Sequence, residues 1–138
     1  MGARGWHLER AKRNKQASEA FEDEWPEWCI VALFYSALHY VHSSLADEPD
    51  LERDERHPRK HTSPGGADGR GVNQLVRDIY PEIHAQYRSL FELGHRTRYD
   101  VQQLGPLTIP MARQQWSDIK DFCEGKNQGR PSRRSRDV

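Results

Sequence analysis

Histidine and arginine are the residues of this chain that are best suited to chemistry. The 138-residue sequence holds seven histidines, at positions 7, 39, 42, 57, 61, 84 and 95. Two of them lie in the charged segment Arg56-His57-Pro58-Arg59-Lys60-His61. An imidazole moves protons near neutral pH, and the planar fork of arginine fits phosphate oxygens. Together they suit metal-free cleavage of an RNA phosphodiester, in which a base takes the 2′-hydroxyl proton, an acid protonates the leaving 5′-oxygen and arginine stabilises the charge on phosphorus.

Two other interpretations of these histidines stay open. His39, His57 and His61 could be ligands of a metal ion, but Pro58 separates the loop histidines and no carboxylate or cysteine completes a ligand pattern. The segment could also be a solvated loop, since charge runs commonly are. Phosphate chemistry is favoured over a metal site, and neither a metal ion nor another cofactor is expected.

Composition limits the classes to which the chain can belong. Lys plus Arg and Asp plus Glu each number 21, so the chain as a whole is not a polycation for non-specific nucleic-acid binding. Only 35% of the residues are apolar, which predicts a small core and a homodimer that buries more surface. The two cysteines, Cys29 and Cys123, predict buried thiols rather than a disulfide framework.

The location expected from the sequence is the cytoplasm. The first residues carry charges with no apolar stretch behind them, so no secretory signal is expected. The apolar run from Trp28 to Val41 is shorter than the roughly 20 residues that a membrane span needs. No membrane contact is therefore predicted.

Apolar residues recur at three- and four-residue steps, which predicts an all-α protein. The expected helices cover residues 5–20, 26–45, 70–97 with a kink about Pro81, and 108–124. Pro26 suits a first helical turn, Thr108 is expected to cap the last helix, and the polar segment between residues 47 and 70 is expected to be a loop. One domain over residues 1–125 and a disordered basic tail over residues 126–138 follow.

Four motifs in this order resemble bacterial HEPN-domain proteins, and the resemblance covers most of residues 5–123. The motifs are His7-Leu8-x2-Ala11-x2-Asn14; Trp28-Cys29-x4-Phe34-Tyr35-x2-Leu38-His39; His57-Pro58-x2-His61 leading to Arg70-x2-Asn73-x2-Val76; and Tyr87-x2-Leu90-x2-Leu93 leading to Arg98-Tyr99. The resemblance implies an up-and-down bundle of four to five helices that is usually dimeric. It also implies a metal-independent endoribonuclease of a toxin–antitoxin or antiviral system, with an antitoxin or defence protein as partner.

The candidate site is chosen both from the family resemblance and from the chemistry of the side chains. His61 is the favoured acid or base, with Arg70 and Arg98 to hold the phosphate and Tyr99 to orient it or stack on a base. His57 and His39 complete the catalytic set, and the expected RNA-binding residues are Arg56, Arg59, Lys60 and Arg96.

The family's active motif is an arginine followed four to six residues later by a histidine. Arg56 and His61 match that spacing, but in the loop; at the late position the chain has Arg98-Tyr99 with no histidine after them. The alternative is therefore a non-catalytic HEPN-like module that binds a nucleotide or a protein. A helical interaction protein without a site is the third interpretation.

Overall fold

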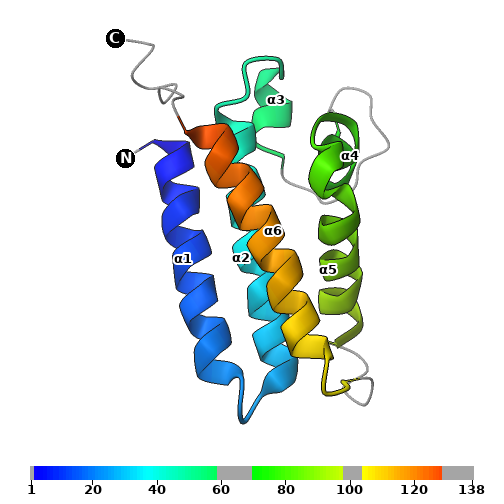
Figure 1. Ribbon diagram of the computed structural model, residues 1–138. Helices are drawn as coiled ribbons and strands as arrows, with labels where there is room; N and C mark the ends of the chain where they lie inside the picture. The colour runs from blue at the N-terminus through cyan, green and yellow to red at the C-terminus, as the bar shows by residue number, and fades with distance from the viewer. Residues whose placement is uncertain (1, 59–69, 98–103, 129–138) are drawn as a thin grey trace.

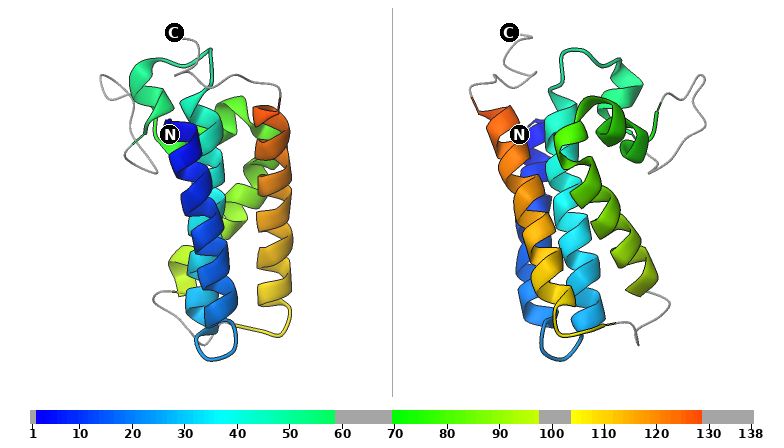
Figure 2. Two further views of the ribbon diagram at one scale, coloured as in Figure 1. Left: turned by 90° about the vertical axis from the view of Figure 1, so that its left-hand side faces the viewer. Right: turned by 45° about the vertical axis from the view of Figure 1, so that its right-hand side comes forward.

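The computed structural model describes residues 2–58, 70–97 and 104–128, and these residues form an all-α fold. Four long helices run along the molecule: α1 (Ala3–Phe21), α2 (Pro26–Ala46), α5 (His84–Thr97) and α6 (Thr108–Asn127). Figure 1 shows that successive long helices run in opposite directions, and the views in Figure 2 agree. No strand occurs within the described ranges, so the predicted all-α class is confirmed.

The predicted helix over residues 70–97 is divided into three pieces. Helix α4 (Val72–Ile79) is followed by a single 3-10 turn, η2 (Pro81–Ile83), and then by α5. Pro81 has no amide hydrogen to continue the α4 hydrogen-bond ladder, so the helix is interrupted there. A four-residue helix, α3 (Arg53–Arg56), lies in the segment that was expected to be a loop.

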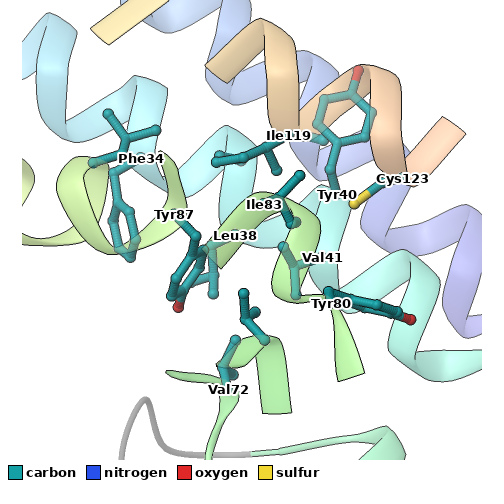
Figure 3. Packing of buried hydrophobic residues seen from close by; sticks show 14 of the residues in the cluster. Phe34, Leu38, Tyr40, Val41, Val72, Tyr80, Ile83, Tyr87, Ile119 and Cys123 are labelled. Atoms are coloured by element: carbon teal, nitrogen blue, oxygen red, sulfur yellow. The ribbon is translucent and has the colours of Figure 1, made fainter. Parts of the chain in front are cut away.

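Helix α2 is the centre of the core and contacts α1, α5 and α6. The apolar residues of these helices, α4 and η2 interlock around it, as Figure 3 shows for Phe34, Leu38, Val41, Tyr87 and Ile119. Both Cys29 and Cys123 are buried free thiols, as predicted.

Most of the apolar side chains of α2 are buried within the chain, but Trp28 is 49% exposed. By length and composition α2 is the one described helix that could cross a membrane, but 83% of its apolar window is buried inside the bundle.

One hydroxyl group joins three of the long helices. Ser36, in the middle of α2 and fully buried, donates a hydrogen bond to the carbonyl oxygen of Ala11 in α1 at 2.6 Å. Oγ of Ser36 also accepts a hydrogen bond from Nε1 of Trp116 in α6 at 2.8 Å. Buried polar groups need such partners, and here each partner lies on a different helix.

Both ends of α6 differ from the sequence-based expectation. Thr108 is the first helical residue rather than the cap, and its Oγ1 accepts a hydrogen bond from the amide of Gly105 at 2.9 Å. The helix continues through Gly125 to Asn127, so residues 126 and 127 are not part of a disordered tail. The last turn is held because Nδ2 of Asn127 donates to Oγ of Ser43 in α2 at 3.1 Å. The rest of the predicted tail, residues 129–138, lies outside the described residues.

We expect Ser36→Ala to lower the free energy of unfolding by about 1–3 kcal/mol, because it leaves the indole N–H of Trp116 without its partner. Urea unfolding followed by circular dichroism measures this. Trp116→Phe in the Ser36→Ala background should cost less than Trp116→Phe in the wild type, since the shared hydrogen bond is already absent. Equal costs in the two backgrounds would contradict this account of the junction.

Gly94 sets the approach of α5 to α2. A Cβ at this position would lie 3.2 Å from Cβ of Phe34, closer than ordinary van der Waals contact. We expect Gly94→Val to lower the free energy of unfolding by about 1–3 kcal/mol through overpacking. Gly125→Ala is the matched control, because nothing lies within 4 Å of its Cβ. It should raise stability by about 0.5–1 kcal/mol, and destabilisation by both variants would point to a general intolerance of helical side chains instead.

Candidate functional site

Three imidazoles gather between the start of α1 and the last turns of α2, and we call them the histidine cluster: His7, His39 and His42. Nδ1 of His7 lies 2.9 Å from Nδ1 of His39. The ring of His42 is nearly parallel to that of His7, with centroids 4.8 Å apart. The cluster forms because α1 and α2 are antiparallel, which brings the beginning of one helix beside the end of the other (Figure 1).

The contact between His7 and His39 fixes how their protons are shared. A hydrogen bond between two Nδ1 atoms needs one protonated and one bare nitrogen. When both rings are neutral, the donor ring has a bare Nε2, and the acceptor ring carries its proton on Nε2. No described residue hydrogen-bonds to either Nε2. A neutral pair therefore presents one proton acceptor and one proton donor.

The surroundings keep this pair neutral. Burial is the main cause that lowers the pKa of His7 to about 4, and the nearby His39 and His57 lower it further. Burial also lowers the pKa of His39, with a smaller contribution from the positive charge of Arg10. Both rings are only half-buried, so solvent or a ligand can still reach the cluster.

An exposed tryptophan and an arginine flank the cluster. The ring of Trp6 meets His7 edge-on with centroids 5.0 Å apart, and it meets His39 with centroids 5.8 Å apart. The guanidinium of Arg10 lies 4.9 Å from the centre of the Trp6 ring. Trp6 is 47% exposed, which is unusual for a tryptophan. An aromatic face, a cation and two imidazoles are thus present together.

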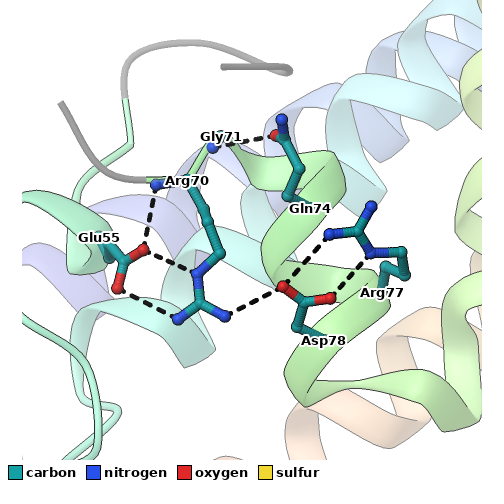
Figure 4. A network of polar contacts seen from close by, with 6 residues as sticks. All are labelled: Glu55, Arg70, Gly71, Gln74, Arg77 and Asp78. Atoms are coloured by element: carbon teal, nitrogen blue, oxygen red, sulfur yellow. Dashed lines mark hydrogen bonds and ion pairs between the residues drawn. The ribbon is translucent and has the colours of Figure 1, made fainter. Parts of the chain in front are cut away.

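Arg70 is not presented to the histidine cluster as a free phosphate ligand. Its Nε and Nη2 donate to the carboxylate of Glu55 at 2.7 and 3.2 Å, and its Nη1 donates to Asp78 at 3.0 Å. Figure 4 shows this network, in which Arg77 also pairs with Asp78. The hydrogen bonds from Arg70 lower the pKa of Glu55. Those from Arg77 and then Arg70 lower the pKa of Asp78. Arg70 therefore ties α3 to α4.

The other predicted site residues are distributed over both ends of the bundle. His57, at the end of α3, is near enough to the cluster to act on the pKa of His7, so the structure brings His39 and His57 into one region. Arg56 donates from Nε to the carbonyl oxygen of Glu48 at 3.0 Å. Arg96 is exposed in the last turn of α5, at the end of the bundle opposite α3 and α4 (Figure 1). The predicted residues that lie outside the described residues are Arg59, Lys60, His61, Arg98 and Tyr99.

Metal coordination was the less favoured interpretation of the histidines. Among the residues that the structure describes, no group of three or more His, Cys, Asp or Glu side chains is arranged to hold a metal ion. In the cluster, the Nδ1 atoms of His7 and His39 are already hydrogen-bonded to each other.

A second feature is a groove of about 350 Å³ that is lined by residues of α4 and α5. Arginines, a histidine and an aromatic ring contribute to it: the lining residues are Asn73, Gln74, Arg77, His84, Tyr87, Arg88, Phe91 and Glu92. Its volume lies within the usual range for small-molecule sites. Arg77 is paired with Asp78 and Arg88 with Glu92, so the groove is not strongly cationic.

The sequence-based site omitted Trp6, His7 and Arg10. Their spacing contained a signal, because residues three or four positions apart share a helix face, and His39 and His42 are spaced in the same way on α2. Whether His7 and Arg10 on α1 lie opposite His39 and His42 on α2 depends on the register between the two helices. The spacing of residues within one helix does not reveal that register.

The titration of His7 should make the protein less stable as the pH is lowered. Its pKa is near 6.5 in the unfolded chain and about 4 in the folded one. Between these values the unfolded chain binds a proton that the folded chain does not bind, so lowering the pH favours unfolding. We expect the free energy of unfolding to decrease from pH 6.5 to pH 4, and to decrease less in His7→Gln, as measured by urea unfolding at several pH values. The exposed His95 gives the control: His95→Asn should keep the wild-type slope, and an unchanged slope in His7→Gln would exclude this linkage.

Comparisons of the chain with family models, curated proteins and solved structures found no match. The function is therefore proposed from the residues of this chain and their geometry.

Proposed function

We propose that the protein handles RNA as a HEPN-like, metal-independent endoribonuclease whose acid–base pair is His7 and His39. The observation that carries the proposal is the 2.9 Å contact between their Nδ1 atoms in a half-buried site that lowers both pKa values. Two neutral imidazoles that share one proton hold a base and an acid at the same time. A general base must be unprotonated at the working pH, and a lowered pKa ensures this.

The pair would cleave RNA by transfer of the phosphoryl group to the neighbouring hydroxyl. The bare Nε2 takes the proton of the ribose 2′-hydroxyl, and the 2′-oxygen forms a bond to phosphorus. The bond from phosphorus to the 5′-oxygen breaks, and the other ring gives its Nε2 proton to that oxygen. Passage of the shared proton between the two Nδ1 atoms then restores a neutral pair. The products are a 2′,3′-cyclic phosphate and a 5′-hydroxyl.

Trp6 and Arg10 supply what the imidazoles lack. The exposed indole offers a face on which an unpaired base can stack, as aromatic side chains do in single-stranded RNA recognition. The guanidinium of Arg10 is near enough to lower the pKa of His39, so it can also stabilise negative charge on a phosphate at the cluster. His57 lies in the same region and is available to an RNA strand that reaches α3.

A non-catalytic nucleotide-binding module is the second candidate. The α4–α5 groove favours it, because Phe91 offers a half-buried ring and Arg77 and Arg88 offer cations at its edge. In that case the protein would bind a nucleotide in the groove and leave RNA intact. The pairing of both arginines with carboxylates makes this site weaker for phosphate than one with unpaired arginines.

The deciding experiment is incubation of the purified protein with a 5′-labelled single-stranded RNA in EDTA. We expect cleavage that ends in a 2′,3′-cyclic phosphate. His39→Ala and His7→Ala should each reduce the rate by about a hundredfold or more, the scale of a lost acid–base group. Circular dichroism of each variant verifies that the helices are intact.

His95→Asn is the control, since this exposed histidine lies toward the other end of the bundle, and it should cleave at the wild-type rate. Because the neutral pair supplies both acid and base, the rate should rise with pH through the lowered pKa values and then stay level to pH 8. The endoribonuclease proposal is wrong if the wild type leaves RNA intact, or if the double variant of His7 and His39 still cleaves it. Binding of a nucleotide without cleavage would favour the second candidate.

A further inference from the structure

Most of the exposed large apolar side chains lie at the end of the bundle opposite the histidine cluster. We call this set the aromatic end: Phe21, Trp25, Trp28, Leu107 and Met111. Trp25 is 53% exposed, Trp28 49% and Leu107 77%. Among the described residues, Trp6 is the only other exposed large apolar side chain. The set comes from the end of α1, the start of α2 and the start of α6, which meet at the bottom of Figure 1.

The aromatic end is also acidic. Residues 16–28 contain five Asp or Glu residues and no Lys or Arg. Two of these carboxylates have cationic partners, because Glu19 pairs with Lys15 and Glu22 pairs with Arg113. No cation within the described ranges pairs with Asp23, Glu24 or Glu27. The first turn of α2 accounts for Glu27, since a helix N-terminus favours a carboxylate, but Asp23 and Glu24 precede the helix.

We propose that the aromatic end is a docking surface for a basic amphipathic segment of another protein. Tryptophan is enriched among the residues that dominate protein–protein binding, and here it is exposed at two neighbouring positions. The unpaired carboxylates around it match lysine or arginine on the partner, which favours the encounter and fixes its orientation.

The charges at this end disfavour the other occupants. A second copy docking by a two-fold axis would bring Asp23, Glu24 and Glu27 against the same three residues. An RNA strand or an anionic membrane would meet the same carboxylates with phosphates. A purely basic segment would pair with the carboxylates and leave the apolar side chains in water, so the partner needs apolar side chains as well as cations.

The test uses a fluorescein-labelled leucine–lysine helix peptide, LKKLLKLLKKLLKL, and the full chain, with binding followed by anisotropy. We expect saturable binding that weakens by about tenfold or more in Trp25→Ala, and similarly in the double variant Glu24→Gln/Glu27→Gln. A peptide of residues 129–138 of this chain, which is basic with almost no apolar residues, should bind much more weakly. The charge-matched control is the double variant Glu52→Gln/Asp54→Asn, in which Glu52 precedes α3 and Asp54 lies within it. This variant should bind the helix peptide as tightly as the wild type does.

Four results would overturn the proposal. The first is no binding of the helix peptide by the wild type, and the second is equal weakening by the α3 control pair. The third is a dimer in sedimentation that Trp25→Ala dissociates, which would assign this end to a second copy. The fourth is binding of the chain to phosphatidylcholine vesicles that Trp25→Ala abolishes, which would assign it to a membrane surface. None of these measurements depends on RNA cleavage, so this proposal and the proposed function can fail separately.

Discussion

The hydroxyl group of Ser36 holds three of the four long helices in register. It lies halfway along α2, donates to α1 and accepts from α6, with no exposure to water. Apolar contacts alone leave helices some freedom to slide or rotate, whereas a buried polar group must keep its partners. The alignment of α1 with α2 decides whether His7 meets His39, and these histidines lie about one helical turn from Ala11 and Ser36 in the direction of the cluster. The geometry of the candidate site therefore depends on a serine that takes no part in it.

The hairpin of α1 and α2 separates the charges of a neutral chain. The part of α1 between Arg4 and Lys15 carries five basic residues and one acidic residue, and it begins beside the histidine cluster. The turn that follows carries the unpaired carboxylates of the aromatic end. At about 1.5 Å per residue, the two ends of the 19-residue helix α1 lie nearly 30 Å apart. An RNA at one end and a basic protein at the other would each be repelled from the wrong end, so both could be bound together.

Sequence periodicity located the long helices because each has a buried face that recurs at helical spacing. It did not find α3, whose four residues are all charged and none of which is buried. It ended α6 too early, because the bond between Asn127 and Ser43 joins residues 84 positions apart. The candidate site shows the same dependence on tertiary packing. His39 and His57 could be selected by residue type, but their proximity to His7 and Trp6 follows only from the packing of α1 against α2. Arginine is a common phosphate ligand, but only the fold shows that the guanidinium of Arg70 is already paired with the carboxylates of Glu55 and Asp78.

The pairing of Arg70 with Glu55 and Asp78 closes a loop in the chain. Glu55 and Arg70 are 15 residues apart, and their side chains hold the two ends of the intervening segment together. In general, the entropic cost of closing a loop grows only with the logarithm of its length, by about 0.6 kcal/mol for each doubling. A change in the number of residues between Glu55 and Arg70 would therefore cost little, as long as these two side chains still hold the start of α4 beside α3.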